Sequence, residues 1–181
     1  SSLKTKFTSG IRCELPEQTY LEMAQWYEDL GSYDEAIEIL ELSPANAMVH
    51  LKLAYLNHQL NNSTESNLYL QKSIESSPEF ILPFRHENLA MLEWAVQNSD
   101  SWKPKFYLGL LQWKFGKMDE ARDLFSKCGS EPDFASFYLT KVELFREQEG
   151  YDPEPDLIMA NELAPDQWRT FSYLTYYYLS K

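Results

Sequence analysis

Apolar residues recur along most of the chain with the spacing of an α-helix. Tyr20, Ala24 and Tyr27 follow one another at intervals of four and three residues, and similar intervals return in later segments. This spacing places apolar side chains on one face of a helix. Gly, Pro and Asn, which tend to break helices, interrupt the pattern at short intervals. The pattern therefore predicts ten helices, over residues 16–30, 33–42, 44–60, 64–76, 83–97, 102–115, 118–128, 132–148, 153–163 and 166–180.

No segment alternates between apolar and polar residues as a half-buried strand does. Glycine, which all-β proteins use freely in turns, contributes only 6 of the 181 residues. The sequence therefore predicts an all-α protein. Residues 1–15 lack the helical spacing, and we expect them to form an extended or disordered lead-in to a helical array over 16–181.

Two polar segments carry the chemistry of helix starts. Ser32 is followed three residues later by Glu35, which is the pattern of a capping box. Ser43 precedes Pro44, and proline suits the first position of a helix. We therefore expect helices to begin directly after Ser32 and Ser43.

Residues 30–36 and 115–121 share one pattern: apolar, Gly, any residue, apolar, Asp, Glu, Ala. The pattern resembles the turn and the start of the second helix in a tetratricopeptide repeat. That repeat consists of two antiparallel helices over about 34 residues. The resemblance implies a right-handed α-α superhelix in which successive hairpins bury their apolar faces against one another.

The register of these segments implies four repeat units and the beginning of a fifth. The units lie near 17–46, 47–80, 102–133 and 134–167, with a truncated fifth unit from 168. The helix expected over 83–97 falls outside the alternation and is therefore an inserted element. The fourth unit fits least well, because Lys141 stands where the repeat has a small residue.

A narrower resemblance rests on the inserted helix and the segment after it. These residues read Pro83-Phe84-Arg85, then Leu92-Glu93-Trp94-Ala95, then Trp102-Lys103-Pro104-Lys105-Phe106-Tyr107-Leu108. They resemble the repeat region of large bacterial proteins that also have an uncharacterised, carbohydrate-related N-terminal domain.

The repeat resemblance implies a function in binding. The first helix of each unit lines a concave groove that can hold an extended peptide or a partner helix. Trp, Tyr and Arg are enriched among residues that dominate binding energy. The candidate groove residues are Gln25, Tyr55, His58, Gln59, Trp113, Lys114, Tyr138 and Arg146. A second interpretation remains open at each position, namely packing against the inserted helix or a neighbouring unit.

The sequence offers no convincing catalytic, cofactor or metal site. His86-Glu87 begins like a zinc-protease motif, but Ala90 stands where the second histidine belongs. The carboxylate pair Asp34-Glu35 lies in a first helical turn, where negative charge stabilises the helix dipole. Gly-rich phosphate loops and nucleophile-elbow motifs are absent from the sequence. We therefore expect a protein without enzymatic activity.

Charge and composition narrow the range of partners. The formal net charge is −12, whereas nucleic-acid binding needs a basic surface. We therefore expect a protein or peptide partner and no nucleic acid, with an RNA-binding helical repeat as an alternative. No apolar run is long enough to span a bilayer. Two cysteines, Cys13 and Cys128, are too few for a disulfide framework. The sequence leaves the cellular compartment of the protein open, with the cytoplasm slightly favoured.

The two ends of the chain indicate a piece of a longer protein. The first residues, Ser1 and Ser2, include no initiator methionine. The last helix, over 166–180, is rich in aromatic residues and has no second helix to cover it. We expect its aromatic face to be covered by a second molecule, giving self-association, or to stay exposed. A further alternative for the whole chain is an accessory or regulatory helical segment of a larger carbohydrate-active protein.

Overall fold

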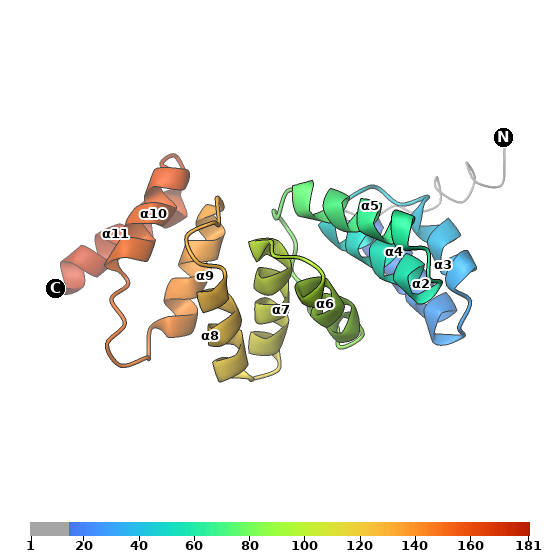
Figure 1. The fold of residues 1–181 in the computed structure, drawn as a ribbon. Coiled ribbons are helices and arrows are strands. Elements are labelled where there is room, and N and C mark those ends of the chain that lie inside the picture. Colours follow the sequence, from blue (N-terminus) through green and yellow to red (C-terminus); the bar gives the residue numbers. More distant parts are fainter. Residues whose placement is uncertain (1–14) are drawn as a thin grey trace. The chain divides into compact units, whose positions relative to one another are not determined.

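The computed structural model describes residues 15–181, and its regular elements in this range are ten α-helices and no strands. The prediction of an all-α protein is therefore confirmed. Successive helices are joined by loops, the longest of which in the described part of the chain covers residues 76–87 (Figure 1). They group into two compact units: unit 1 has residues 15–81 and 85–99, and unit 2 has residues 82–84 and 100–181. The lead-in expected over 1–15 lies outside the described residues, apart from Leu15.

Unit 1 contains two helical hairpins and one further helix. Its helices are α2 (Pro16–Asp29), α3 (Tyr33–Leu40), α4 (Ala47–Gln59), α5 (Ser63–Glu75) and α6 (Asn88–Gln97). α2 packs on α3, α4 packs on α5, and α6 packs on α4. Ala24, Ala36 and Ala54 are fully buried, and their small side chains let the helices approach closely. The larger Tyr20 and Leu40 fill the core between α2, α3 and α4.

Three hairpins turn through a residue with left-handed backbone geometry. These residues are Gly31 (φ +75°), Asn61 (φ +59°) and Gly116 (φ +76°). In each turn the next amide donates to the carbonyl oxygen five residues earlier: Ser32 to Tyr27 at 2.9 Å, Asn62 to Asn57 at 2.8 Å and Lys117 to Gln112 at 3.0 Å. This bond closes the end of the first helix. The pattern shared by 30–36 and 115–121 is therefore one turn geometry, which also occurs at Asn61 without a glycine.

Unit 2 is built around aromatic side chains. Its helices are α7 (Trp102–Lys114), α8 (Met118–Lys127), α9 (Ala135–Phe145), α10 (Glu154–Leu163) and α11 (Trp168–Ser180). The pairs α7–α8, α9–α10 and α10–α11 pack against each other. The rings of Phe125 on α8 and Phe137 on α9 stack with their centroids 5.2 Å apart. Phe106 on α7 meets both rings edge to face, with centroid distances of 5.5 Å. These three rings join α7, α8 and α9 into one core.

Gly109 lies where α7 approaches α8 most closely, and its replacement by alanine should destabilise the protein. An added Cβ atom would lie 2.8 Å from the ring of Phe125, which is buried and held by Phe137. We expect Gly109→Ala to lower the free energy of unfolding by about 1–3 kcal/mol, although alanine favours a helix by about 1 kcal/mol. Urea unfolding followed by circular dichroism measures the change. The exposed Lys114→Ala on the same helix is the control, and a gain in stability from Gly109→Ala would contradict the prediction.

The helix predicted from residue 44 begins at Ala47. The residue that caps it is Asn46, whose side-chain oxygen accepts a hydrogen bond from the Val49 amide at 2.9 Å. The Ser43 hydroxyl donates instead to the carbonyl oxygen of Pro44 at 2.9 Å. The expectation that Ser43 caps this helix was therefore wrong, because Asn46 satisfies the free amides of the first turn. Ser32 does precede α3, but its side chain makes no capping hydrogen bond.

Two further helices are shorter than predicted. The inserted helix expected over 83–97 is α6, which begins at Asn88. Just before it, the Arg85 side chain forms an ion pair with Glu22 of α2. The helix expected over 132–148 is α9, which spans Ala135–Phe145 and is preceded by Phe134 in an extended conformation. Proline residues near both predicted starts restrict the backbone there, and apolar spacing alone does not show this.

Candidate partner-binding groove

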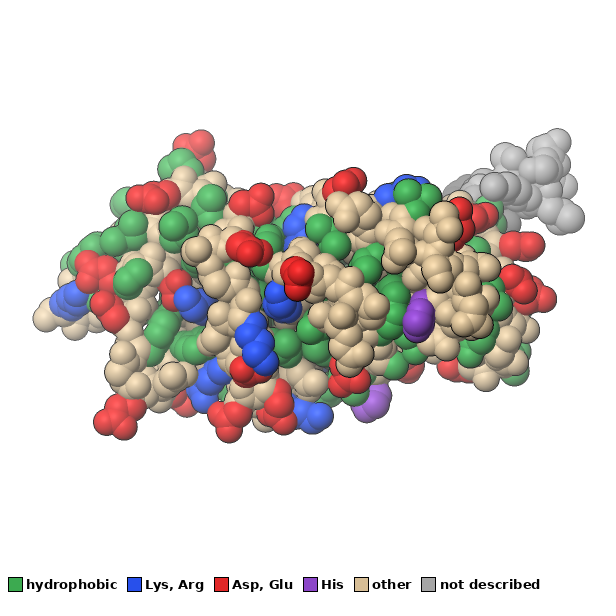
Figure 2. All heavy atoms as spheres, in the orientation of Figure 1, with side chains coloured by type: hydrophobic (Ala, Val, Ile, Leu, Met, Phe, Trp, Pro, Cys, Tyr) green, Lys and Arg blue, Asp and Glu red, His purple; other side chains and the backbone are tan. Residues whose placement is uncertain are grey.

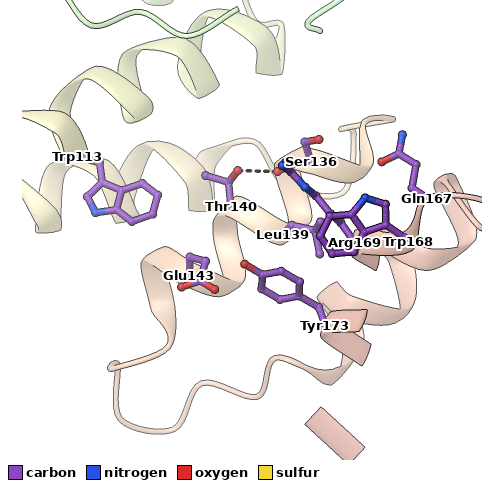
Figure 3. Close-up of a pocket in the computed structure, with 9 residues that line it drawn as sticks. All are labelled: Trp113, Ser136, Leu139, Thr140, Glu143, Gln167, Trp168, Arg169 and Tyr173. Atoms are coloured by element: carbon purple, nitrogen blue, oxygen red, sulfur yellow. Dashed lines mark hydrogen bonds between the residues drawn. The ribbon is translucent and has the colours of Figure 1, made fainter. Parts of the chain in front are cut away.

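In unit 2, helices α7, α9 and α11 border a surface hollow of about 420 Å³. Each of these helices is the first helix of a predicted repeat. We call it the α9–α11 hollow (Figure 3). Its lining residues share an aromatic or polar character and are Trp113, Ser136, Leu139, Thr140, Glu143, Gln167, Trp168, Arg169 and Tyr173. Cavities that bind small ligands or side chains span roughly 300–1,000 Å³, so the hollow has room for a large side chain.

The aromatic walls of the hollow come from separate helices. Trp113 lies on α7, whereas Trp168 and Tyr173 lie on α11. Figure 3 shows the Tyr173 ring directed toward the Glu143 carboxylate of α9. Burial, followed by the nearby Glu143 carboxylate, raises the pKa of Tyr173. Tyr173 therefore stays a neutral hydrogen-bond donor at neutral pH.

Charged groups of both signs lie at the rim of the hollow. The guanidinium of Arg169 lies over the ring of Trp168, 5.7 Å from its centroid. The Glu143 carboxylate also accepts a hydrogen bond from Arg146 at 3.2 Å. The rim can thus donate hydrogen bonds from Arg169 and accept them at Glu143, next to apolar surface from Trp113.

A smaller hollow of about 180 Å³ adjoins the first. Its lining residues are Trp113, Met118, Arg122, Glu143, Leu144, Arg146 and Glu147. Trp113 and Glu143 line both hollows, so they form the boundary between them. Arg122 is held in place because its side chain donates to the carbonyl oxygen of Leu144 at 3.2 Å.

The residues of α9 that line the hollow are shifted by one position toward the C-terminus from the predicted groove residues. Tyr138, a predicted groove residue, is only 5% exposed, and its hydroxyl donates to the carbonyl oxygen of Pro132 at 2.9 Å. The residues of α9 that line the α9–α11 hollow are Ser136, Leu139, Thr140 and Glu143. The prediction for Tyr138 was therefore wrong.

The misfit of Lys141 was the sequence signal for this shift. If the fourth repeat is counted from Ala135, where α9 begins, the position that holds a small residue in the repeat falls on Val142 and no longer on Lys141. Val142 is buried. Lys141 then points to α10, where its ammonium donates to Asp156 at 2.8 Å. Lys141 at the position of a small residue therefore indicated that the predicted register of the fourth repeat was wrong. The sequence alone did not show that Lys141 pairs with Asp156.

In unit 1 the inserted helix α6 packs against Tyr55 and His58, two of the predicted groove residues of α4, but His58 stays exposed. Trp94 of α6 packs against Tyr55 and His58, with ring-centroid distances of 5.8 Å and 5.2 Å. Gln59 is exposed. The ion pair between Arg85 and Glu22 holds the segment before α6 near α2. The half-buried Tyr55 therefore packs against the inserted helix, whereas His58 contacts Trp94 and remains exposed.

Gln25 takes part in a network inside unit 1. Its amide oxygen accepts a hydrogen bond from Lys52 at 2.8 Å, and its amide nitrogen donates to Asp29 at 2.7 Å. The ammonium of Lys52, which is 2% exposed as a residue, also forms an ion pair with Glu28. Gln25 is therefore positioned to satisfy a buried charge. Lys114, a further predicted residue, is exposed and lines neither hollow.

Of the eight predicted groove residues, Trp113 and Arg146 line the hollows of unit 2. Sequence reasoning missed Trp168, Arg169 and Tyr173 because it treated the last helix as a truncated unit. Its high aromatic content was the available signal.

Two features of the described residues concern metal binding and thiol reactivity. Within residues 15–181, no group of three or more His, Cys, Asp or Glu side chains could hold a metal ion. Cys128 is buried, and burial raises the pKa of its thiol to about 12, so it is not a reactive thiolate at neutral pH. In the same part of the chain, no helix is both long and apolar enough to cross a membrane.

Comparisons with known proteins give one local match and several distant structures. Residues 17–43 match the model of the tetratricopeptide repeat family. No curated protein matches the chain. Among solved structures, TTC0263, a thermophilic TPR protein in Thermus thermophilus, is 17% identical with a TM-score of 0.43, over 90% of this chain and 99% of that one. MamA 41-end from Desulfovibrio magneticus RS-1 is 13% identical with a TM-score of 0.39, over 84% and 97% of the two chains.

Likenesses this distant carry no information about what the chain binds. The family match is more specific, because it falls on a segment whose helices, α2 and α3, pack as an antiparallel pair around the Gly31 turn. Residues 17–43 are thus similar to one tetratricopeptide repeat.

Proposed function

We propose that the protein is a non-enzymatic interaction module that holds a peptide or helix of a partner protein against α7, α9 and α11. The observation that carries this proposal is the α9–α11 hollow, whose walls include Trp113, Trp168 and Tyr173. Trp and Tyr supply large contact areas at a small cost in side-chain entropy, and they dominate many interfaces. A large apolar side chain of the partner would enter the hollow.

The polar groups at the rim would orient the partner. Arg169 can donate to a backbone carbonyl or a carboxylate, and Glu143 can accept from a backbone amide or a cation. Such groups contribute specificity, while the aromatic surface contributes most of the affinity. In unit 1, α6 already packs on the corresponding face of α4, so the proposal assigns the partner to unit 2.

Catalysis has no support in the hollow. Its two aliphatic hydroxyls belong to Ser136 and Thr140, and Thr140 donates to the carbonyl oxygen of Ser136 at 2.6 Å. A nucleophile needs a base beside it; no histidine lines the hollow, and its carboxylate, Glu143, accepts a hydrogen bond from Arg146. The excess of acidic side chains, many of them visible on the face in Figure 2, supports a protein partner over a nucleic acid.

The accessory role in a larger carbohydrate-active protein stays a prediction, as does the narrower resemblance behind it. The narrower resemblance rests on residues 83–108 alone. The proposed function rests on unit 2 alone.

Peptides selected against the immobilised protein from a displayed random library test the proposal. Trp113→Ala should weaken the selected peptides at least tenfold, which corresponds to about 1.4 kcal/mol or more, because it removes the wall shared by both hollows. Isothermal titration calorimetry measures the affinities. The control is Trp26→Ala, which removes an equally large exposed aromatic side chain in unit 1. Equal effects of the two substitutions, or selected peptides that bind equally well after Trp113→Ala, would contradict the proposal.

A further inference from the structure

Helix α11 exposes one continuous stripe of uncharged side chains. The stripe follows the helical period and consists of Trp168, Phe171, Ser172, Thr175, Tyr176 and Leu179. Its large members are 72% (Trp168), 64% (Phe171), 77% (Tyr176) and 82% (Leu179) exposed. We call it the α11 stripe. Exposed apolar surface of this extent marks an interaction site more often than a free surface.

The other side of α11 is already occupied by its own unit. The hydroxyls of Tyr177 and Tyr178 donate to Asp152 at 3.0 Å and to Glu154 at 2.7 Å. The fully buried Thr170 donates to the carbonyl oxygen of Ala164 at 2.9 Å. These contacts fix the rotation of the helix, so the stripe faces solvent in the single chain.

We propose that the α11 stripe binds the same stripe of a second copy of the chain, with the two helices antiparallel around a twofold axis. This surface shares Trp168 with the α9–α11 hollow, whereas its other members do not line the hollow. The chain has a net charge of −12, whereas this stripe carries no charge, so two copies can meet here without direct charge repulsion.

The order of residues along α11 makes the stripe complementary to itself. If two α11 helices pair antiparallel with their centre between Ser172 and Thr175, Ser172 of each copy faces Thr175 of the other copy. The same centre pairs Phe171 with Tyr176, and Trp168 with Leu179. Small residues at the centre let the helix axes approach closely, while the large residues pack on either side.

Charges at the two ends of α11 support the antiparallel direction. Asp166 lies just before the helix and Lys181 just after it, and both are exposed. Within its own chain the Lys181 ammonium forms an ion pair with Glu154 at 2.7 Å, so in the dimer it would lie between Glu154 and the second copy's Asp166. The antiparallel pairing brings Asp166 of one copy beside Lys181 of the other. It also aligns the helix dipoles in opposite directions, which is favourable. A parallel pair would place like charges together at each end.

The size of the stripe predicts a weak dimer. An aromatic side chain buries roughly 150–250 Å², so the exposed parts of the stripe provide on the order of 500 Å² per copy, or about 1,000 Å² in total. This is the lower limit for a specific interface. We therefore expect a dissociation constant of about 1 μM or higher.

Sedimentation velocity of the 181-residue protein from about 1 μM to 1 mM tests the proposal. The weight-average mass should rise from 21.3 kDa toward twice this value. Tyr176→Glu should keep the mass at that of the monomer, because it places two charges against an apolar surface. The matched control Trp26→Glu alters an aromatic residue that is 68% exposed in unit 1, and it should leave the association unchanged.

The test also separates this surface from the groove and examines the register. Tyr176 does not line the α9–α11 hollow, so Tyr176→Glu should retain peptide binding. Asp166→Lys should weaken the dimer about two- to fivefold, and adding Lys181→Asp should restore it. A monomer at all concentrations would overturn the proposal and leave the stripe to a different partner. Equal effects of the Tyr176 and Trp26 substitutions would overturn it as well, and failure of the double variant to recover would overturn the antiparallel register.

Discussion

Replacing Glu28 by glutamine should lower the free energy of unfolding by about 3 kcal/mol, the largest effect that we expect from any conservative substitution here. Glu28 forms an ion pair with Lys52, whose side chain is only 3% exposed. The remaining partner of Lys52, Gln25, is a neutral amide at 2.8 Å. Without the Glu28 carboxylate, the Lys52 ammonium would stay buried with no opposite charge beside it, and this desolvation is costly.

Replacing the other partner of this ion pair, Lys52, should lower the free energy of unfolding much less. Lys52→Met removes the buried charge and keeps most of the side-chain volume, while the Glu28 side chain is 15% exposed and can be hydrated. We expect a loss of less than about 1 kcal/mol. Urea unfolding of both variants, followed by circular dichroism, measures the two values. The larger loss from Glu28→Gln is expected because it leaves the Lys52 ammonium buried without an opposite charge. Equal losses of unfolding free energy in the two variants would contradict this explanation.

Replacing Asp156 by asparagine should destabilise unit 2 by about 2–3 kcal/mol. Asp156 is 9% exposed and connects α9 with α10. One of its oxygens accepts from Lys141 at 2.8 Å, and the other accepts from the Tyr151 hydroxyl at 2.6 Å. Burial, together with the bond to Asp156, raises the pKa of Tyr151. Asparagine can accept at only one position, so Lys141 or Tyr151 would lose its acceptor.

The exposed pair of Asp123 and Lys127 provides the matched control. It lies on a single turn of α8, and the Asp123 side chain is 58% exposed. Asp123→Asn should change the free energy of unfolding by no more than about 0.5 kcal/mol, because solvent screens such pairs. Thermal unfolding of the two asparagine variants compares them directly. A loss from Asp123→Asn as large as that from Asp156→Asn would contradict this ranking.

Helices and turns were predictable because their causes are local. The apolar spacing around Tyr20 and Ala24 gave the buried face of α2, and both residues are buried. Gly31 and Gly116 marked turns because glycine adopts a positive φ without strain. Asn61 makes the same turn, and the sequence pattern around it was weaker only because asparagine also occurs outside turns.

The candidate site was less predictable, because groove positions depend on rotation of a helix by a single residue. One residue turns a helix face by about 100°. The prediction for α9 was one residue early and therefore selected the buried Tyr138 in place of Leu139 and Glu143. Trp113 does line both hollows, because Gly116 fixed the register of α7 independently.

The sequence by itself determined the all-α class, the succession of ten helices and the turns that join the hairpins, since these follow from spacing and backbone preference within a few residues. Only the tertiary structure decided which side chains stay open to a partner. α6 packs over Tyr55 and His58 through Trp94, Asp156 accounts for Lys141, and α11 adds Trp168 and Tyr173 to the hollow. Each of these outcomes depends on contacts between residues far apart in the chain, and local pattern carries no record of them.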